Sequence, residues 1–184
     1  MVALTNLPLT GPDTSSDPLV QQTYHEIEQE LGFGIVPNIF RSMSDHPSIL
    51  AANWQKFKAT ILAGQLPRSV KEMLGVAISH VNGSEYAKQV HLHSLSVQGV
   101  HELWLQQLLA DEIQEDTLPE TIMAMVVFAR KAAQRASAMD VSDIYALREA
   151  GVSDTEIFEV IATVDLFQSV NAYTDLMGVE IDNI

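Results

Sequence analysis

Helix boundaries recur along almost the entire chain, and they constrain the fold more than any other feature of the sequence. Apolar residues repeat every three or four positions within segments that open on a capping residue or a proline and close on a glycine. The first such segment follows Asp17-Pro18 and ends at Gly32. No stretch alternates between apolar and polar residues for long enough to indicate a strand. The sequence therefore predicts an all-α protein.

The same signals predict where the other helices lie. Ser84 can cap the helix that follows it, and Ser153 with Glu156 has the spacing of a capping box. A short helix is expected from Asn38 to about His46. Longer helices are expected over residues 48–63, 66–82, 84–99, 102–111, 120–139, 140–150 and 157–178.

Domain organisation follows from the distribution of these helices. Residues 1–16 are rich in proline, glycine, threonine and serine and lack sustained periodicity, which predicts an extended arm. Residues 17–184 are expected to form a single helical domain. Residues 98–100 and 150–152 both read x-Gly-Val after a predicted helix. This repeated pattern is consistent with a duplicated helical hairpin, and it is also consistent with the glycine turn that ends many helices.

Composition excludes several classes of function. None of the 184 residues is cysteine, which rules out disulfides, zinc–thiolate sites, iron–sulfur clusters and any thiol chemistry carried by the chain itself. The 24 acidic residues outnumber the 10 lysines and arginines, and the net charge of −14 disfavours nucleic acids as partners. No apolar run approaches the roughly 20 residues that span a membrane, and no secretion signal is recognised. A soluble cytoplasmic protein is expected.

Glu72 and His91 are the candidate catalytic residues. Glu72 lies on the flank of an apolar helical face, where an unpaired carboxylate is costly. The nearest partner is His91, because consecutive helices joined by a short turn pack antiparallel. A Glu–His pair can relay a proton, and the charge on the histidine would lower the pKa of Glu72. The same two residues could instead form a structural salt bridge in the core.

The other histidines do not form a recognisable metal motif. His91 and His93 project about 200° apart on a helix and cannot bind one ion together. His80 shares an apolar face with Met73 and is expected to be a core or interface residue. A site made of Glu72, His80 and His91 is conceivable across two helices, but no spacing signature supports it. We therefore expect no metal and no other cofactor.

Two stretches, residues 66–73 and 79–91, resemble the carboxymuconolactone decarboxylase family. Within that family the chain is most similar to the alkylhydroperoxidase AhpD-like, peroxidase-related branch. Residues 36–41, 140–151 and 171–179 extend the resemblance over nearly the whole chain. The resemblance implies an all-α helical bundle, often with duplicated helical hairpins, that assembles into a homo-oligomer, either a trimer or a hexamer.

The redox motif of the family is a glutamate, C-x-x-C beginning twelve residues later, and a histidine four residues after the second cysteine. Glu72 and His91 match its ends, whereas Ser84 stands at the first cysteine position and Ala87 at the second. In AhpD-like members a thiolate attacks a hydroperoxide, and the second thiol then forms a disulfide with it. Ser84 and Ala87 can do neither. The resemblance thus implies an antioxidant oxidoreductase that detoxifies hydroperoxides, while the missing thiols argue against a thiol peroxidase.

Two functions of different classes remain open, and whether the protein is an enzyme remains open with them. In the first, Glu72 and His91 perform acid–base chemistry on a small carboxylate or lactone, with Ser84 positioning the substrate and Ala87 inert. The decarboxylase that gives the family its name works without a cysteine pair, which keeps this reading open. In the second, the protein is a catalytically silent binding or assembly module.

Overall fold

The computed structural model describes residues 9, 11, 14–110, 114 and 117–183, and the regular structure in this part of the chain is helical throughout. The all-α prediction is confirmed. The predicted arm over 1–16 and the predicted helix end near residue 111 lie largely outside the described residues. The elements are α1 (Pro18–Leu31), α2 (Asn38–Arg41), α3 (Pro47–Phe57), the π-helical turn η1 (Lys58–Leu62), α4 (Arg68–Asn82), α5 (Glu85–Val97), α6 (Glu102–Leu108), α7 (Glu120–Arg135), the 3₁₀ turn η2 (Ala136–Ala138), α8 (Val141–Glu149) and α9 (Asp154–Met177).

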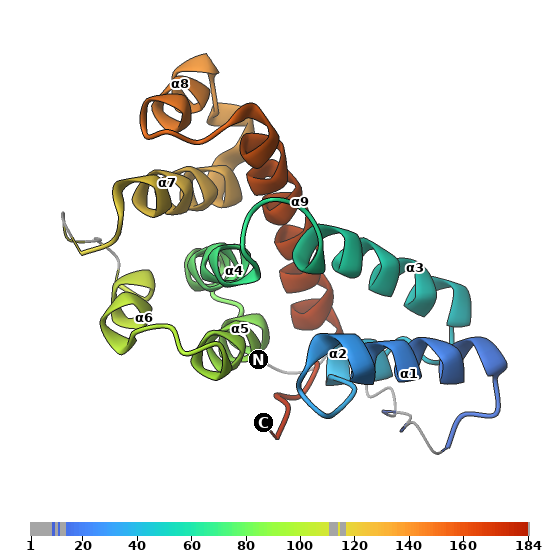
Figure 1. The fold of residues 1–184 in the computed structure, drawn as a ribbon. Coiled ribbons are helices and arrows are strands. Elements are labelled where there is room, and N and C mark those ends of the chain that lie inside the picture. Colours follow the sequence, from blue (N-terminus) through green and yellow to red (C-terminus); the bar gives the residue numbers. More distant parts are fainter. Residues whose placement is uncertain (1–8, 10, 12–13, 111–113, 115–116, 184) are drawn as a thin grey trace.

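Helix α4 lies at the centre of the molecule. Helices α5, α6, α7 and α9 pack around it, as Figure 1 shows, and every residue from Val70 to Ser79 is buried. Charged groups inside such a helix are costly unless they are paired, and both Lys71 and Glu72 have partners. None of the helices in the described part of the chain is long and apolar enough to cross a membrane.

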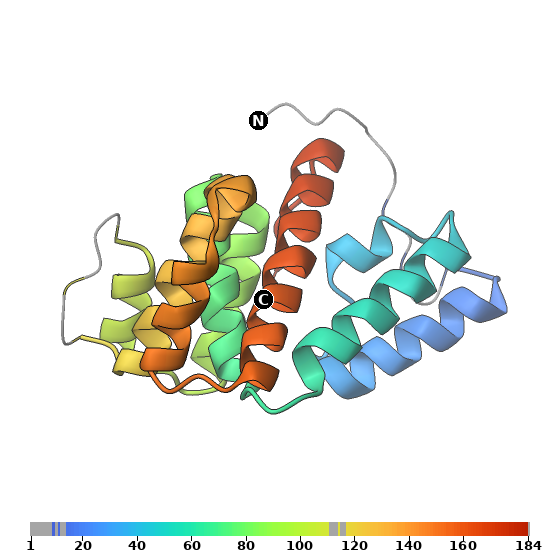
Figure 2. The ribbon, with the colours of Figure 1, turned by 90° about the horizontal axis from the view of Figure 1, so that it is seen from above.

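The long helix α9 runs between two groups of helices. Figure 2 shows α1, α2 and α3 on one side of it and α4 to α8 on the other. Each group has its own apolar core, one built around Tyr24, Trp54 and their neighbours and the other around α4. Phe57 and Val170 pack against both cores. The junction between the two groups is where the pocket described below is found.

Most predicted helix boundaries are confirmed, and their capping groups explain them. Asp17 accepts hydrogen bonds from two backbone N–H groups at the start of α1, and Pro18 occupies its first position. Gly32 ends α1 with a φ of 82°, a conformation that side-chain-bearing residues rarely adopt. The capping box of Ser153 and Glu156 is formed at the start of α9.

Three local expectations were wrong. The short helix expected from Asn38 to about His46 is the single turn α2, which ends at Arg41. Ser84 is the N-cap residue of α5, but its hydroxyl makes no capping hydrogen bond and donates instead to Asp175 Oδ1 on α9, at 3.0 Å. The helix expected over residues 48–63 changes to a π-helical turn over its last five residues. This turn contacts α4 through Lys71, whose buried Nζ donates hydrogen bonds to the backbone oxygens of Thr60 and Ala63 at 2.8 and 2.5 Å.

Candidate functional site

Glu72 and His91 face each other across the hairpin of α4 and α5. His91 Nδ1 lies 2.7 Å from Glu72 Oε2, and both side chains are buried. The tight turn at Gly83 brings the two helices together antiparallel, because its φ of 69° reverses the chain directly after α4. The expected pairing of the two residues is confirmed.

The other oxygen of Glu72 is also fully engaged. Ser94 Oγ donates to Glu72 Oε1 at 2.9 Å, and Arg68 Nε donates to the same atom at 3.2 Å. Arg68 is in turn held by the backbone oxygen of Leu31, 2.9 Å from its Nη1. An ionised carboxylate with these partners only accepts hydrogen bonds. Its bond to His91 therefore places a proton on Nδ1.

This arrangement leaves the second ring nitrogen of His91 as the reactive atom. His91 Nε2 is buried and has no hydrogen-bond partner among the residues that the structure describes. When the ring is neutral with its proton on Nδ1, Nε2 carries a lone pair and can accept a proton from a bound molecule. The carboxylate of Glu72 would then stabilise the imidazolium that forms. The geometry is that of a carboxylate–histidine general base.

The pKa of Glu72 reflects these contacts. Burial by itself raises the pKa of this carboxyl, but the hydrogen bond and charge of His91, the charge of Arg68 and the hydrogen bond from Ser94 together hold it below its usual value. This is the direction expected from the sequence. Because the pKa is lower in the folded than in the unfolded chain, the stability that Glu72 contributes is present above its unfolded pKa. That stability is lost as the pH falls through the lowered, folded pKa.

The position of the His91 ring depends on a glycine in α4. The ring packs edge-on against Phe167 of α9, with 4.2 Å between the ring centroids. A Cβ atom at Gly75 would lie 2.9 Å from both aromatic rings, closer than such atoms approach in proteins. Gly75 therefore leaves the space in which His91 and Phe167 meet.

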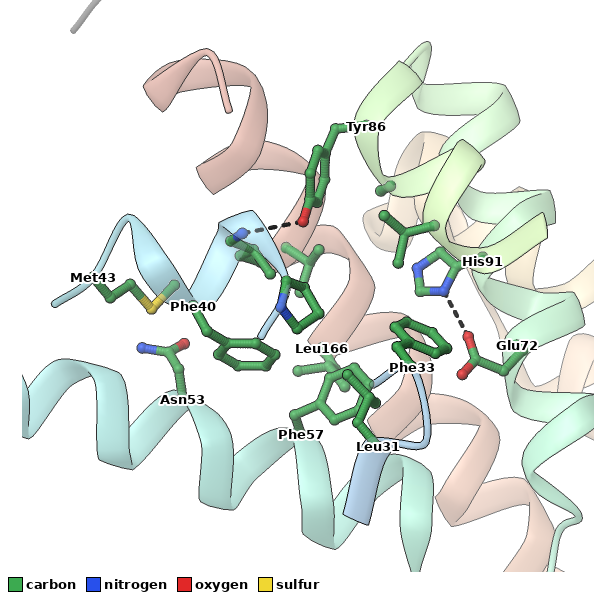
Figure 3. Close-up of a pocket in the computed structure, with 15 residues that line it drawn as sticks. Leu31, Phe33, Phe40, Met43, Asn53, Phe57, Glu72, Tyr86, His91 and Leu166 are labelled. Atoms are coloured by element: carbon green, nitrogen blue, oxygen red, sulfur yellow. Dashed lines mark hydrogen bonds and ion pairs between the residues drawn. The ribbon is translucent and has the colours of Figure 1, made fainter. Parts of the chain in front are cut away.

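A small pocket opens beside the imidazole at the junction of the two helix groups. Its volume is about 40 Å³, and Figure 3 shows the imidazole facing it, with Nδ1 turned toward Glu72. Helices α1, α2, α3, α4, α5 and α9 and the α1–α2 connection supply its walls, with α4 contributing Glu72. The walls are almost entirely apolar and include Phe33, Phe40, Phe57, Tyr86, Ala87 and Leu166.

The structure separates the two positions at which the family carries cysteine. Ala87 lines the pocket, one helical turn before His91 on the same face of α5. Ser84 is buried but does not line the pocket, and its hydroxyl is held by Asp175. His80 does not line the pocket either. Within the described residues, no group of three or more His, Asp or Glu side chains could hold a metal ion.

Sequence reasoning assigned no role to Arg68, Ser94, Gly75 or Phe167. Arg68 precedes Glu72 by four residues and Ser94 follows His91 by three, so helical spacing alone places each on the same face as its neighbour. That signal was present in the sequence. Phe167 lies on α9, some eighty residues further along the chain, and no local sequence pattern predicts its contact with His91.

Comparisons with known proteins support the family resemblance over part of the chain. Residues 48–114 match the model of the carboxymuconolactone decarboxylase family, which confirms the resemblance over the segment that holds Glu72 and His91. No curated protein matches the chain.

Several solved structures share the fold at low sequence identity. An uncharacterised peroxidase-related protein from Ralstonia eutropha, described as an alkylhydroperoxidase AhpD core, is 24% identical with a TM-score of 0.85 over 100% of this chain and 95% of its own. A peroxidase-related protein from Silicibacter sp. is 20% identical, with a TM-score of 0.82 over 98% and 92%. The debrominase Bmp8, in complex with 2,3,4-tribromopyrrole, is 20% identical, with a TM-score of 0.78 over 99% and 95%. At these identities the likeness establishes the fold alone.

Proposed function

We propose that this protein binds a small, mostly apolar molecule beside His91 and that Glu72 and His91 perform acid–base chemistry on it without a thiol step. The observation that carries the proposal is the unpartnered Nε2 of His91, buried and facing an apolar pocket while Nδ1 is fixed by an ionised carboxylate. Buried polar atoms normally have a partner, so a free one facing a pocket is available for a ligand.

The walls of the pocket favour a neutral ligand over a carboxylate. Among the described residues that line it there is no lysine or arginine. The guanidinium of Arg68 lies over the ring of the lining residue Phe33, but it is already engaged by Glu72, Leu31 and Ser94. A free carboxylate would therefore enter without a counter-charge, next to the carboxylate of Glu72. A lactone or an aromatic molecule with one acidic proton suits this chemistry better.

Hydroperoxide reduction by a thiol is not the function we propose. The chain has no cysteine, and the pocket-side position of the family motif is Ala87. The ligand of the debrominase complex, 2,3,4-tribromopyrrole, is a small apolar ring with a single N–H group. It supports the class of ligand proposed here, although the chemistry of that protein is not transferred to this one.

Binding of 4-nitrophenol tests the proposal, because the molecule is yellow only when it is ionised. We expect the bound phenol to be more ionised than the free phenol at the same pH, since His91 Nε2 takes its proton and Glu72 stabilises the charged ring. Absorbance titration measures the effect. His91→Gln should abolish this increase in ionisation on binding. His25→Gln, at an exposed position on α1, should leave the increase unchanged.

The outcome also decides between the two functions left open by the sequence. Binding of 4-nitrophenol as the neutral phenol, with the same spectrum in the native protein and in His91→Gln, would contradict acid–base chemistry. The protein would then be better described as a silent binding module.

We also propose that the chain forms a homo-oligomer, as the family resemblance implies. An open apolar groove of about 550 Å³ between α7, α8 and α9 supports this, with Val141 and Ile161 exposed at its lining. Light scattering at micromolar concentration should give the mass of at least three chains, and Ile161→Glu should lower it. Val97→Glu, at an exposed position outside the groove, is the control. A single-chain mass for the native protein would contradict assembly.

A further inference from the structure

The closed pocket is smaller than the ligands that its chemistry suits. A cavity on the order of 150 Å³ is needed to hold a benzene ring, whereas the pocket beside His91 measures about 40 Å³. Most of the side chains that line it are buried. One wall must therefore move before an aromatic molecule reaches Nε2.

Helix α2 is the wall best suited to move. It is a single turn of four residues, and it contributes Ile39 and Phe40 to the pocket, with Pro37 directly before it. The remaining helical walls come from α1, α3, α4, α5 and α9, which are all longer than α2. The side chains of Ile39 and Phe40 pack in the core around Tyr24 and Trp54, so movement of α2 must also separate these apolar contacts. A one-turn helix has few internal hydrogen bonds and depends on tertiary contacts for its position.

Hydrogen bonds from the segment after α9, and from Tyr86 of α5, hold the start of α2. Asp182 Oδ1 accepts the backbone N–H of Asn38 at 2.7 Å, and its Oδ2 accepts the hydroxyl of Tyr86 at 2.7 Å. The same tyrosine oxygen accepts the backbone N–H of Ile39 at 3.0 Å, as Figure 3 shows. The backbone oxygen of Glu180 accepts the side-chain amide of Asn38 at 3.0 Å. Figure 1 shows this end of the chain beside α2 and α5.

We infer that residues 179–183 form a latch, closed by Asp182, that holds α2 over the pocket and must release for a ligand to reach His91. The inference deepens the proposed function, because the latch controls access to the same pocket. Asp182 is the residue that joins the movable wall to a fixed one, since one carboxylate binds the start of α2 and the hydroxyl of a pocket residue on α5.

The latch is suited to reversible opening. It is a short segment without regular structure, its neighbours Ile181 and Asn183 are exposed, and only Asp182 is buried in its second half. Burial raises the pKa of the Asp182 carboxyl, against the hydrogen bonds from Tyr86 and Asn38. The closed state thus carries a desolvation penalty that release into water removes.

Exchange of fluorobenzene, followed by ¹⁹F NMR, tests the latch. Asp182→Asn keeps the shape of the side chain but replaces one of its two accepting oxygens with a donor. We expect it to raise the rate of fluorobenzene association about tenfold and to lower the Kd by about the same factor, because a hydrogen bond to a charged group is lost only from the closed, ligand-free wall. Glu180→Gln is the matched control, since the latch uses only the backbone oxygen of that residue.

Two further measurements keep the test decisive. Tyr86→Phe removes the hydroxyl and keeps the aromatic wall, so it should accelerate fluorobenzene exchange in the same way. Hydrogen exchange of the Asn38 and Ile39 amides should also speed up about tenfold in Asp182→Asn, because these amides are the groups that the latch covers.

The outcomes separate the latch from the chemistry. Fluorobenzene has no acidic proton, so its exchange reports on access even if His91 transfers no proton. Unchanged exchange rates in both variants, or no uptake of fluorobenzene by either the native protein or the variants, would overturn the latch. A failure of the 4-nitrophenol test alone would overturn the acid–base function and leave the latch standing.

Discussion

Replacing His91 with glutamine is expected to lower the rate at which this protein opens 5-nitrobenzisoxazole by about 100-fold or more. This flat, neutral substrate loses its ring C–H proton to a base while its N–O bond breaks, giving a coloured phenolate in one step. His91 Nε2 is the base that the structure provides, and general-base catalysis contributes about 10²- to 10⁴-fold. The initial rate of colour formation measures the effect directly.

Two variants sharpen this prediction. Glu72→Gln keeps the shape of the side chain and one hydrogen bond to Nδ1 but removes the charge that stabilises the imidazolium, so it should lower the rate less than His91→Gln. His25→Gln should have no effect, because His25 is exposed on α1 away from the pocket. Equal rates for the native protein and His91→Gln would show that the pocket supplies no base.

Dithiol-dependent hydroperoxide turnover is expected to be absent from the native protein and to appear in the double variant Ser84→Cys/Ala87→Cys. A thiolate introduced at position 87 would lie in the pocket, one turn before His91, and could attack the hydroperoxide. The O–O bond breaks, an alcohol leaves, and the sulfenic acid condenses with the thiol at position 84 with loss of water. The dithiol then reduces the disulfide, and peroxide consumption measures turnover.

The surroundings of the two positions predict how the variants will differ. A thiol at position 84 would lie beside Asp175, whose charge disfavours a thiolate. Ala87→Cys alone should therefore react with peroxide faster than Ser84→Cys alone, and adding Asp175→Asn to the double variant should increase turnover about tenfold. Turnover by the native protein, or faster reaction at position 84 than at position 87, would contradict this account.

The helices could be predicted from the sequence because their ends are decided locally. Asp17-Pro18 begins α1 and Ser153 with Glu156 begins α9 as expected, since a capping side chain and the backbone N–H groups it binds lie within one turn of each other. The Glu72–His91 pair could be predicted for a similar reason, because the short turn between α4 and α5 makes the two helices pack antiparallel.

Prediction from the local sequence failed where a residue distant in the chain forms a hydrogen bond with the predicted element. Ser84 was expected to cap α5, and Asp175 on α9 takes its hydroxyl instead. The π-helical turn at residues 58–62 has no signal of its own in the sequence, and the buried ammonium of Lys71 bonds two backbone oxygens at its end. At Ser84 a tertiary hydrogen bond outweighs a local capping preference that is worth about 1 kcal/mol.

The sequence by itself determined that this protein is helical, that it can perform no thiol chemistry, and that Glu72 and His91 lie together. These properties depend on composition and on contacts within one hairpin. Only the tertiary structure decided which face of α5 borders the pocket, that Phe167 supports the imidazole, and that Asp182 holds α2 over it. Each of these depends on residues separated by scores of positions in the chain, whose proximity is set by the packing of α9 between the two helix groups.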